Sequence, residues 1–361
     1  MVQSKVNAIE VQNVSKIYGS GVESVKALDN ANLNIFDNEF FTLLGPSGCG
    51  KTTMLNIVSG LVRPSVGSIL FDDKDVTDLK TEDRNIAQVF QFPVIYNTMT
   101  VFENLAFPLL CRDFEKEKIN ERVNSVAETL NLQSFLKSPA RKLTADQKQL
   151  ISLGRGLVRE DVAAVLMDEP LTVIDPDLKF RLRRKLKEIN EQFKTTLVYV
   201  THDQNEAMTF ADNIIVMSDG EVVQAGTPKE LFERPNTTFV GYFIGSPAMN
   251  LFETEASSND CVKINDTLIK TNTNLSKLKE KKIKLGIRSE FIDIASDQRE
   301  NLISVEVQKV EDLGNYKLLT AKTGDLTIKS KIKRETEVPE RDVKLHIPAD
   351  KCCVYENENL V

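Results

Sequence analysis

The stretch that decides the fold reads Gly45-Pro46-Ser47-Gly48-Cys49-Gly50-Lys51-Thr52-Thr53. One apolar run, 40–44, precedes it and another, 54–58, follows, so the glycines stand where a buried strand turns into a helix. Residues without a Cβ let backbone N–H groups point inward at a phosphate, and the positive end of the helix adds to that attraction. Lys51 supplies a cation for the β- and γ-phosphates, and the Thr52 hydroxyl is placed to hold Mg²⁺. The stretch predicts nucleotide binding, and a chance glycine-rich turn is the alternative.

Length and charge narrow the classes of protein that this chain can belong to. Its 361 residues suggest roughly two domains. The net charge of −7, from 46 Lys and Arg against 53 Asp and Glu, argues against nucleic-acid partners and against broad attraction to anionic lipid. No apolar stretch approaches the roughly 18 residues that span a bilayer, the polar start has no signal-peptide core, and the five cysteines have no metal-ligand spacing. We expect a cytoplasmic protein that reaches a membrane only through protein partners.

The apolar patterns along the chain predict an α/β core with a helical and an all-β addition. Alternation over 8–36 indicates antiparallel strands. Further strands are expected at 68–71, 86–90, 163–167 and 196–200, with a hairpin over 214–223. Helical spacing over about 97–157 indicates a helical insertion, and past about 250 short β-rich pieces suggest a small β-barrel. We expect one domain over 1–240 and a second over 241–361.

Two carboxylates follow the strand predicted at 163–167. Asp168 stands at the end of that strand, where it can reach Mg²⁺ through water, and Glu169 can orient or deprotonate an attacking water. Paired acids after a strand are often solvated loop residues, which is the alternative. The apolar run before them and the glycine-rich stretch upstream favour the catalytic interpretation.

His202 and Tyr18 are two further candidates, each with a plain structural alternative. His202 follows the strand predicted at 196–200, and ligands gather at strand ends in open α/β sheets, so it can donate a hydrogen bond to a phosphate oxygen. A capping or core role is the usual one for a single histidine. Tyr18 lies beside Gly19 and Gly21, where an aromatic ring can stack on a base or be an ordinary loop side chain.

The basic residues between 179 and 187 do not predict nucleic-acid binding. Leu178, Leu182, Leu186 and Ile189 recur among them at helical spacing. The charges therefore form the solvated face of an amphipathic helix over 176–193.

Taken in order, these motifs resemble the ATPase subunits of ABC transporters. The order is the glycine-rich stretch 45–53 (the phosphate loop), Gln91 after a strand, the helical insertion, Asp168-Glu169, Asp175 and His202. The resemblance is greatest to the ATP-binding subunits of carbohydrate importers, the group that serves maltose, multiple sugars and sn-glycerol 3-phosphate. It covers 8–250 closely, including 101–109 and 243–250, and the tail more loosely, chiefly through 285–290. It implies an α/β P-loop NTPase with a mixed-sheet core, an antiparallel β subdomain, a helical subdomain and a C-terminal all-β, OB-like regulatory domain.

The resemblance also implies roles for single residues. Tyr18 would stack on adenine. Gln91 would sense Mg²⁺ and the γ-phosphate, while its loop contacts the membrane subunits. His202 would be the switch histidine, and Asp175 would link the two nucleotide sites of a dimer. The implied ligands are ATP and Mg²⁺, and the residues that would hold the ion are Thr52, Gln91 and Asp168.

Partners follow from the same resemblance. They are a second ATPase subunit, two permease subunits in the membrane and, through the complex, a solute-binding protein. The chain itself would be peripheral, on the cytoplasmic face of the membrane. Solute selection would reside in the other chains.

One motif departs from the family pattern. The signature Leu-Ser-Gly-Gly-Gln presents a serine hydroxyl and glycine N–H groups to the γ-phosphate bound by the other subunit, but here it reads Leu143-Thr144-Ala145-Asp146-Gln147. Thr144 keeps a hydroxyl, whereas Ala145 adds a Cβ to a close backbone approach. Asp146 is less compatible, because two unit charges about 4–5 Å apart at an effective dielectric constant near 20 repel by about 3–4 kcal/mol before screening. We expect the site built on this signature to hold ATP poorly.

The altered signature predicts an asymmetric pair of ATPase subunits. In this family each ATP lies between the phosphate loop of one chain and the signature of the other, so a homodimer would place Asp146 at both sites. Because Lys51, Asp168, Glu169 and His202 are all present, we expect this chain to hydrolyse ATP against an intact signature on a different subunit. Glycerol uptake systems of the family pair two unlike ATPases and have a similar signature. The resemblance therefore implies glycerol, glycerol phosphate or a related polyol as the solute.

Other interpretations stay open at this point. A nucleotide-binding structural subunit that does not hydrolyse ATP is one, although the complete catalytic set argues against it. A homodimeric sugar-importer ATPase, whose altered signature a cation or a local rearrangement compensates, is another. A non-transport member, for instance in DNA repair, would need a long coiled-coil insertion or a basic groove, and the sequence contains neither.

Overall fold

The computed structural model describes residues 7–160, 162–172, 174–280, 282–295 and 300–361. The chain forms two compact units, Met1–Pro228 and Lys229–Val361. Within the described ranges, none of the helices is both long and apolar enough to cross a lipid bilayer.

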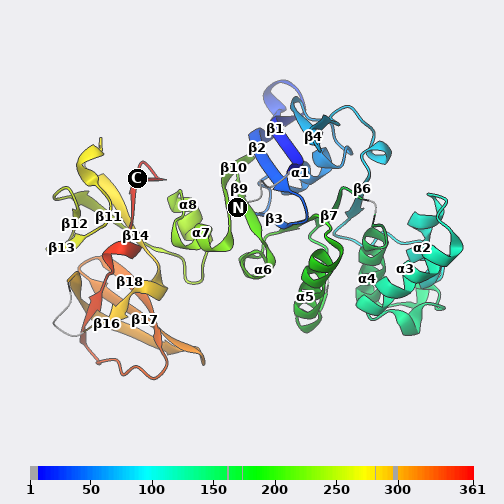
Figure 1. The fold of residues 1–361 in the computed structure, drawn as a ribbon. Coiled ribbons are helices and arrows are strands. Elements are labelled where there is room, and N and C mark those ends of the chain that lie inside the picture. The colour runs from blue at the N-terminus through cyan, green and yellow to red at the C-terminus, as the bar shows by residue number, and fades with distance from the viewer. Residues whose placement is uncertain (1–6, 161, 173, 281, 296–299) are drawn as a thin grey trace, which may run out of the picture. The chain divides into compact units, whose positions relative to one another are not determined.

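A six-stranded mixed sheet forms the centre of the first unit (Figure 1). In spatial order its strands are β10 (Glu221–Gly226), β9 (Asn213–Ser218), β3 (Phe40–Leu44), β8 (Leu197–Thr201), β7 (Ala164–Asp168) and β6 (Ile86–Val89). Neighbours from β9 to β6 run parallel, and β10 pairs with β9 antiparallel. Every residue of β3, β7 and β8 is buried, which is why these strands read as continuous apolar runs rather than alternating ones.

Successive residues of these strands enter two different cores. Phe40 and Val165 pack in one core with the helical insertion, whereas their neighbours Phe41 and Leu166 pack in the other with α1 (Lys51–Val58) and the antiparallel sheet. Because side chains alternate across a strand, the mixed sheet is covered on both faces. Its carboxyl ends, where the candidate residues stand, remain open.

The antiparallel sheet contains the N-terminal strands, as the alternation over 8–36 predicts. In spatial order its strands are β2 (Val25–Phe36), β1 (Asn7–Tyr18), β4 (Val66–Phe71) and β5 (Lys74–Asp75). Tyr18 pairs with Val25 at the end of the β1–β2 ladder.

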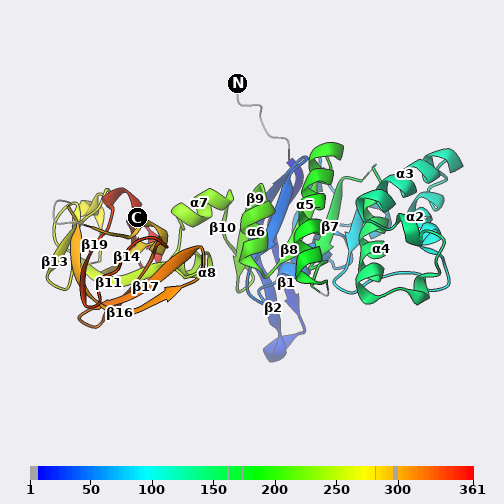
Figure 2. The same ribbon diagram turned by 90° about the horizontal axis from the view of Figure 1, so that it is seen from below.

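The helical insertion contains α2 (Val101–Leu110), α3 (Lys116–Thr129) and α4 (Ala145–Leu157). These helices gather next to β6 in Figure 1, and α4 contacts that strand. Two further helices, α5 (Pro176–Phe193) and α6 (Gln204–Phe210), lie side by side (Figure 2). Leu182, Leu186 and Ile189 of α5 are buried while Arg181, Arg184 and Lys185 are exposed, so the amphipathic interpretation of this helix is confirmed.

The second unit is all-β apart from short helices, as the sequence predicts. One antiparallel sheet contains, in spatial order, β13 (Thr267–Lys270), β12 (Cys261–Ile264), β11 (Asn250–Ala256), β14 (Lys282–Ile287), β20 (Cys353–Glu356) and β21 (Asn359–Leu360). The other contains β15 (Asp293–Ile294), β19 (Asp342–His346), β16 (Leu302–Asp312), β17 (Tyr316–Thr323) and β18 (Leu326–Lys333). Residues of both sheets form one apolar core.

Arg288 explains why the second unit begins before residue 240, where the sequence boundary was expected. Its guanidinium is buried and donates from Nε to the carbonyl oxygen of Phe232 at 2.9 Å, and from Nη1 to those of Gly241 at 2.8 Å and of Ile244. Burial lowers the pKa of Arg288 to about 10. These bonds attach α7 (Pro228–Glu233) and α8 (Thr238–Phe243) to the β-sheets of the second unit.

Candidate active site

The loop between β3 and α1 requires glycine at two positions. Gly50 has a φ of 101°, in the left-handed region, and a Cβ on it would lie 2.5 Å from the carbonyl oxygen of Ala27. A Cβ on Gly45 would lie 2.4 Å from the carbonyl oxygen of Met217. Gly50 is also the N-cap residue of α1, and it has no side chain to accept from the first-turn amides. Those amides therefore suit an anion, which the positive helix end attracts.

Lys51 begins α1 and is buried against its own loop. Its Nζ donates to the carbonyl oxygen of Gly45 at 2.9 Å and to that of Pro46 at 2.8 Å. The thiol of Cys49 lies 3.8 Å from the same Nζ, and burial nevertheless raises the pKa of this thiol. The ammonium thus lies beside the amides. Because the pKa of its thiol is raised, Cys49 stays neutral and is not a reactive thiolate.

Asp168 and Thr52 meet where β7 and α1 face each other. The Thr52 hydroxyl donates to Oδ1 of Asp168 at 3.2 Å. Burial raises the pKa of Asp168 and outweighs the opposing effect of the Thr52 hydrogen bond, and the neighbouring Glu169 raises it further. Among the described residues no group of three or more acidic, His or Cys side chains could hold a metal ion. A hydroxyl and one carboxylate nevertheless fit Mg²⁺, which prefers oxygen ligands, takes few from the protein and relies on water and substrate phosphates for the rest.

Glu169 and His202, which the sequence treats separately, contact each other. Nδ1 of His202 lies 3.0 Å from Oε1 of Glu169. Thr172 donates its hydroxyl to Oε2 of Glu169 at 3.3 Å and to the Glu169 carbonyl oxygen at 3.0 Å. Glu169 has a φ of 44°, an uncommon conformation for a residue with a side chain that costs roughly 1–3 kcal/mol and clusters at functional sites.

One cavity of about 490 Å³ brings most of the predicted residues together. It opens at the carboxyl ends of the parallel strands, where ligands of α/β sheets bind. The predicted residues that line it are Ser47, Gly48, Gly50, Lys51, Thr52, Thr53, Gln91, Asp168, Glu169 and His202. Ala27 and Thr172 also line it and were missed. The position of Thr172, three residues after Glu169 in a turn, is a local signal that could have indicated it.

Tyr18 is not part of the cavity wall, but its place in the sheet brings it near. The ring is half-exposed, and Nζ of Lys16 lies 5.0 Å from its centroid. Tyr18 pairs with Val25, and Ala27, two residues further along β2, lines the cavity. At about 3.3 Å per residue, the backbone of Tyr18 therefore lies roughly 7 Å along the sheet from the level of Ala27.

Asp175 and the signature residues lie outside the cavity, each at the start of a helix. Asp175 caps α5 by accepting from the amide of Asp177 at 3.0 Å. Thr144 caps α4 in a capping box: its hydroxyl accepts from the amide of Gln147 at 3.3 Å, and the Gln147 side chain accepts from the Thr144 amide at 3.1 Å. Ala145 is exposed, and Asp146 stands in the first turn of α4.

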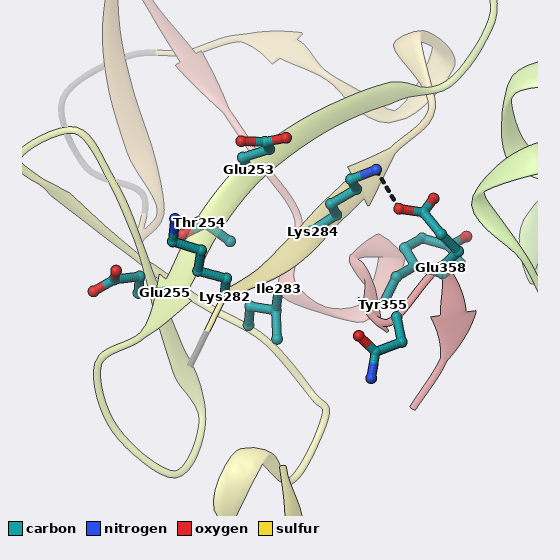
Figure 3. Close-up of a pocket in the computed structure, with 9 residues that line it drawn as sticks. Glu253, Thr254, Glu255, Lys282, Ile283, Lys284, Tyr355 and Glu358 are labelled. Carbon is teal, nitrogen blue, oxygen red and sulfur yellow. Dashed lines mark hydrogen bonds and ion pairs between the residues drawn. The ribbon is translucent and has the colours of Figure 1, made fainter. Parts of the chain in front are cut away.

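A second cavity, of about 460 Å³, lies within the second unit (Figure 3). Its charged residues oppose one another across β11 and β14, with Glu253 paired to Lys284 and Glu255 paired to Lys282. Lys284 also forms an ion pair with Glu358. Three carboxylates thus alternate with two lysines, as on a solvated sheet face, and this cavity shows none of the chemistry of the first one.

Comparisons with known proteins identify the family. The family model described as "ABC transporter" matches residues 28–172. An Escherichia coli relative, the "Uncharacterized ABC transporter ATP-binding protein YcjV", is 38% identical over 97% of this chain and 98% of its own length. The "sn-glycerol-3-phosphate import ATP-binding protein UgpC" of Yersinia pestis is 46% identical over 68% of each chain.

Two solved structures share the fold of the first unit. The ATP-binding cassette MJ0796, in a dimeric post-hydrolysis state bound to ADP and Pi, has a TM-score of 0.55 at 31% identity and covers 61% of this chain and 98% of that one. The protein cbiO1 of Clostridium perfringens, part of the ABC transporter complex cbiONQ, has a TM-score of 0.57 at 27% identity and covers 63% of this chain and 91% of that one. The loop at 45–53 and the cavity at the carboxyl ends of the strands are consistent with these similarities. The chain belongs to the ATP-binding proteins of ABC transporters.

Proposed function

We propose that this chain is the ATP-hydrolysing subunit of an ABC importer for a carbohydrate or polyol. The observation that carries the proposal is the cavity in which Lys51, Thr52, Asp168, Glu169 and His202 meet. A structural subunit that only binds nucleotide would not need the strained Glu169 or its contacts with Thr172 and His202.

Binding would use groups that the loop at 45–53 already orients. Phosphoryl transfer depends on positioning and charge neutralisation. Lys51 would exchange the carbonyl oxygens of its own loop for phosphate oxygens, since charge-assisted hydrogen bonds are the stronger ones. The residues that would hold Mg²⁺ are Thr52, Gln91 and Asp168. The ion would supply positive charge that offsets the negative charge of the phosphates. Tyr18 would stack on the base, a contact of roughly 1–3 kcal/mol.

Hydrolysis would use Glu169 and His202. Glu169 would orient the attacking water and accept its proton, which requires a free carboxylate oxygen. His202 would donate to an oxygen of the γ-phosphate. Oε1 of Glu169 faces the imidazole, so this hydrogen bond would have to loosen for Glu169 to use that oxygen as the base.

The altered signature supports an unlike ATPase partner. Asp146 occupies the helix end that would otherwise face the partner's γ-phosphate, and the Thr144 hydroxyl already caps its own helix. A carboxylate in that position opposes a phosphate by about 3–4 kcal/mol at an effective dielectric constant near 20. We therefore pair this chain with a subunit whose signature is intact, and Asp175 would lie at the contact between the two. The alternative is a homodimer that compensates for Asp146.

The surface beside Gln91 supports docking of permease subunits. Phe90, Phe92, Val94 and Tyr96 expose 37, 70, 52 and 40% of their surface, an apolar group on a single loop. A groove of about 210 Å³ lies between this loop, Pro108 of α2 and the α4 side chains of Ser152 and Arg155. Exposed apolar patches of this kind mark protein interaction sites. The chain would bind there to membrane subunits at the cytoplasmic face.

The nature of the solute rests on likeness alone. The name of the Yersinia pestis relative specifies sn-glycerol 3-phosphate import. We extend this to glycerol, glycerol phosphate or a related polyol for the present chain.

The second unit would then serve a regulatory role, since its own cavity lacks catalytic chemistry.

Glu169→Gln tests the hydrolytic role directly. The amide keeps the shape of the side chain but cannot accept a proton, so single-turnover hydrolysis in the assembled transporter should fall by at least about a hundredfold while ATP stays bound. Glu188→Gln on α5 makes the same change at a surface ion pair with Lys185 and should leave the rate unchanged. Hydrolysis by Glu169→Gln at the wild-type rate would remove Glu169 from its role and favour the structural subunit.

A further inference from the structure

Gln149 connects α4 to both loops that carry catalytic candidates. It is fully buried, about one turn after the start of α4. Its Nε2 donates to the carbonyl oxygen of Phe90 at 3.2 Å and to that of Pro170 at 2.7 Å. Phe90 directly precedes Gln91, and Pro170 directly follows Glu169. One amide group thus contacts the peptide bond that joins Phe90 to Gln91 and the peptide bond one residue beyond Glu169, between Pro170 and Leu171.

Other side chains of α4 extend the contact with the loop after β6. The Ser152 hydroxyl accepts from the amide of Val94 at 3.4 Å, and Arg155 donates to the carbonyl oxygen of the same residue. Gln149, Ser152 and Arg155 are spaced by three residues, so they lie along one face of the helix. A shift of α4 should therefore displace the loop that follows β6, which includes Gln91 and Val94.

We propose that Gln149 is a positioning residue that keeps Gln91 and Glu169 in register with the helix that starts at the signature; this inference rests on the proposed function. When contact with another subunit shifts the N-terminus of α4, Gln149 transmits the position of the helix to the catalytic loops of its own chain. Such coupling is effective because an error of about 1 Å in placement can cost about a hundredfold in rate.

A purely structural role is the alternative, and Asn190 provides a matched control. It is also a buried amide on a helix, α5, and its Nδ2 donates to the carbonyl oxygens of Asn38 at 3.0 Å and of Thr195 at 2.8 Å. These carbonyls precede β3 and β8, at the amino ends of the strands and so opposite the cavity. Both residues therefore form the same kind of bonds at the two ends of one sheet.

The test compares Gln149→Met with Asn190→Leu in the chain assembled with its native partner subunits. Each change removes a buried pair of amide donors and should lower the free energy of unfolding to a similar extent. We expect Gln149→Met to slow single-turnover hydrolysis by roughly ten- to a hundredfold with the Kd for ATP within about twofold, since only positioning is lost. Asn190→Leu should hydrolyse ATP within about twofold of the wild-type rate, because it touches no group near the cavity.

A double-variant cycle separates positioning from general destabilisation. On the Glu169→Gln background, Gln149→Met should slow residual hydrolysis by clearly less than the roughly ten- to hundredfold expected in the wild-type background, because one of the two residues that it positions no longer acts. If Gln149→Met does not fold, Gln149→Asn keeps an amide that is too short to reach both carbonyls, and it should show the same non-additive loss.

Equal rate losses in Gln149→Met and Asn190→Leu, or a full additive loss in the double variant, would overturn the inference. If Glu169→Gln itself retained wild-type hydrolysis, the proposed function would fail instead. The two failures are therefore distinguishable in one set of assays.

Discussion

At the scale of single residues, the contact between Glu169 and His202 is the feature that the sequence did not predict. Glu169 follows β7 and His202 follows β8, and the two side chains lie close together because these strands pair in parallel. With Nδ1 donating to Glu169, the imidazole can donate to a phosphate oxygen only if Nε2 also carries a proton. Lys51 and Thr52, by contrast, were predictable, because their spacing from the glycines is local and determines their place at the helix start.

Asp168 supplies a prediction about stability at this scale. Its folded-state pKa is raised by burial, so the ionised carboxylate destabilises the nucleotide-free chain at neutral pH. Asp168→Asn should therefore raise the melting temperature at pH 7. This gain should shrink as the pH falls through the raised pKa and vanish below the ordinary value near 3.8, where both states are protonated. Thermal unfolding over a pH series measures it.

Asp75→Asn is the control, and its effect has the opposite sign. Hydrogen bonds from Thr77 lower the pKa of Asp75, so its carboxylate stabilises the folded chain above the unfolded-state pKa. The Asn variant should be less stable than wild type at neutral pH, and the difference should disappear as the pH falls through the lowered pKa. A loss of stability at pH 7 in Asp168→Asn would contradict the account of the site.

At the scale of elements, the start of α4 is the feature that distinguishes this chain. The altered signature lies at the start of this helix, where Thr144 and Gln147 form a capping box. The hydrogen bonds from Gln149 were not predictable. A polar residue within a helix is predicted to lie on the solvent-exposed face, and only the tertiary structure shows that Gln149 is buried. In the first turn of α4, Asp146 favours its own helix through the helix dipole and disfavours a phosphate at the same place.

The double variant Ala145→Gly/Asp146→Gly should therefore promote closure of a homodimer on ATP. Removing the carboxylate relieves a repulsion of about 3–4 kcal/mol, while two helix-start glycines cost about 1–2 kcal/mol of stability. In a Glu169→Gln background, light scattering should detect an ATP-dependent dimer that the parent does not form. Lys116→Gly/Glu117→Gly, at the same positions of α3, carries the same glycine cost and should not dimerise. Dimers formed equally well by the parent would support the homodimeric alternative.

At the scale of the whole molecule, the sequence predicted the architecture but placed the boundary between the units too late. The mixed sheet follows from its apolar runs, and the all-β second unit follows from its alternating strands. The predicted boundary at 240 assigned α7 and the start of α8 to the first domain, because helical periodicity does not indicate which hydrophobic core a helix packs against. The bonds of Arg288 to Phe232, Gly241 and Ile244 are among the tertiary contacts that attach them to the second unit.

The most direct test of the central claim is a crystal structure of the Glu169→Gln chain with ATP and Mg²⁺. We expect the triphosphate in the cavity between β3 and α1, with Nζ of Lys51 turned from the carbonyl oxygens of Gly45 and Pro46 to phosphate oxygens, and with the metal beside Thr52 and Asp168. A triphosphate bound elsewhere, with the Lys51 contacts unchanged, would contradict the account.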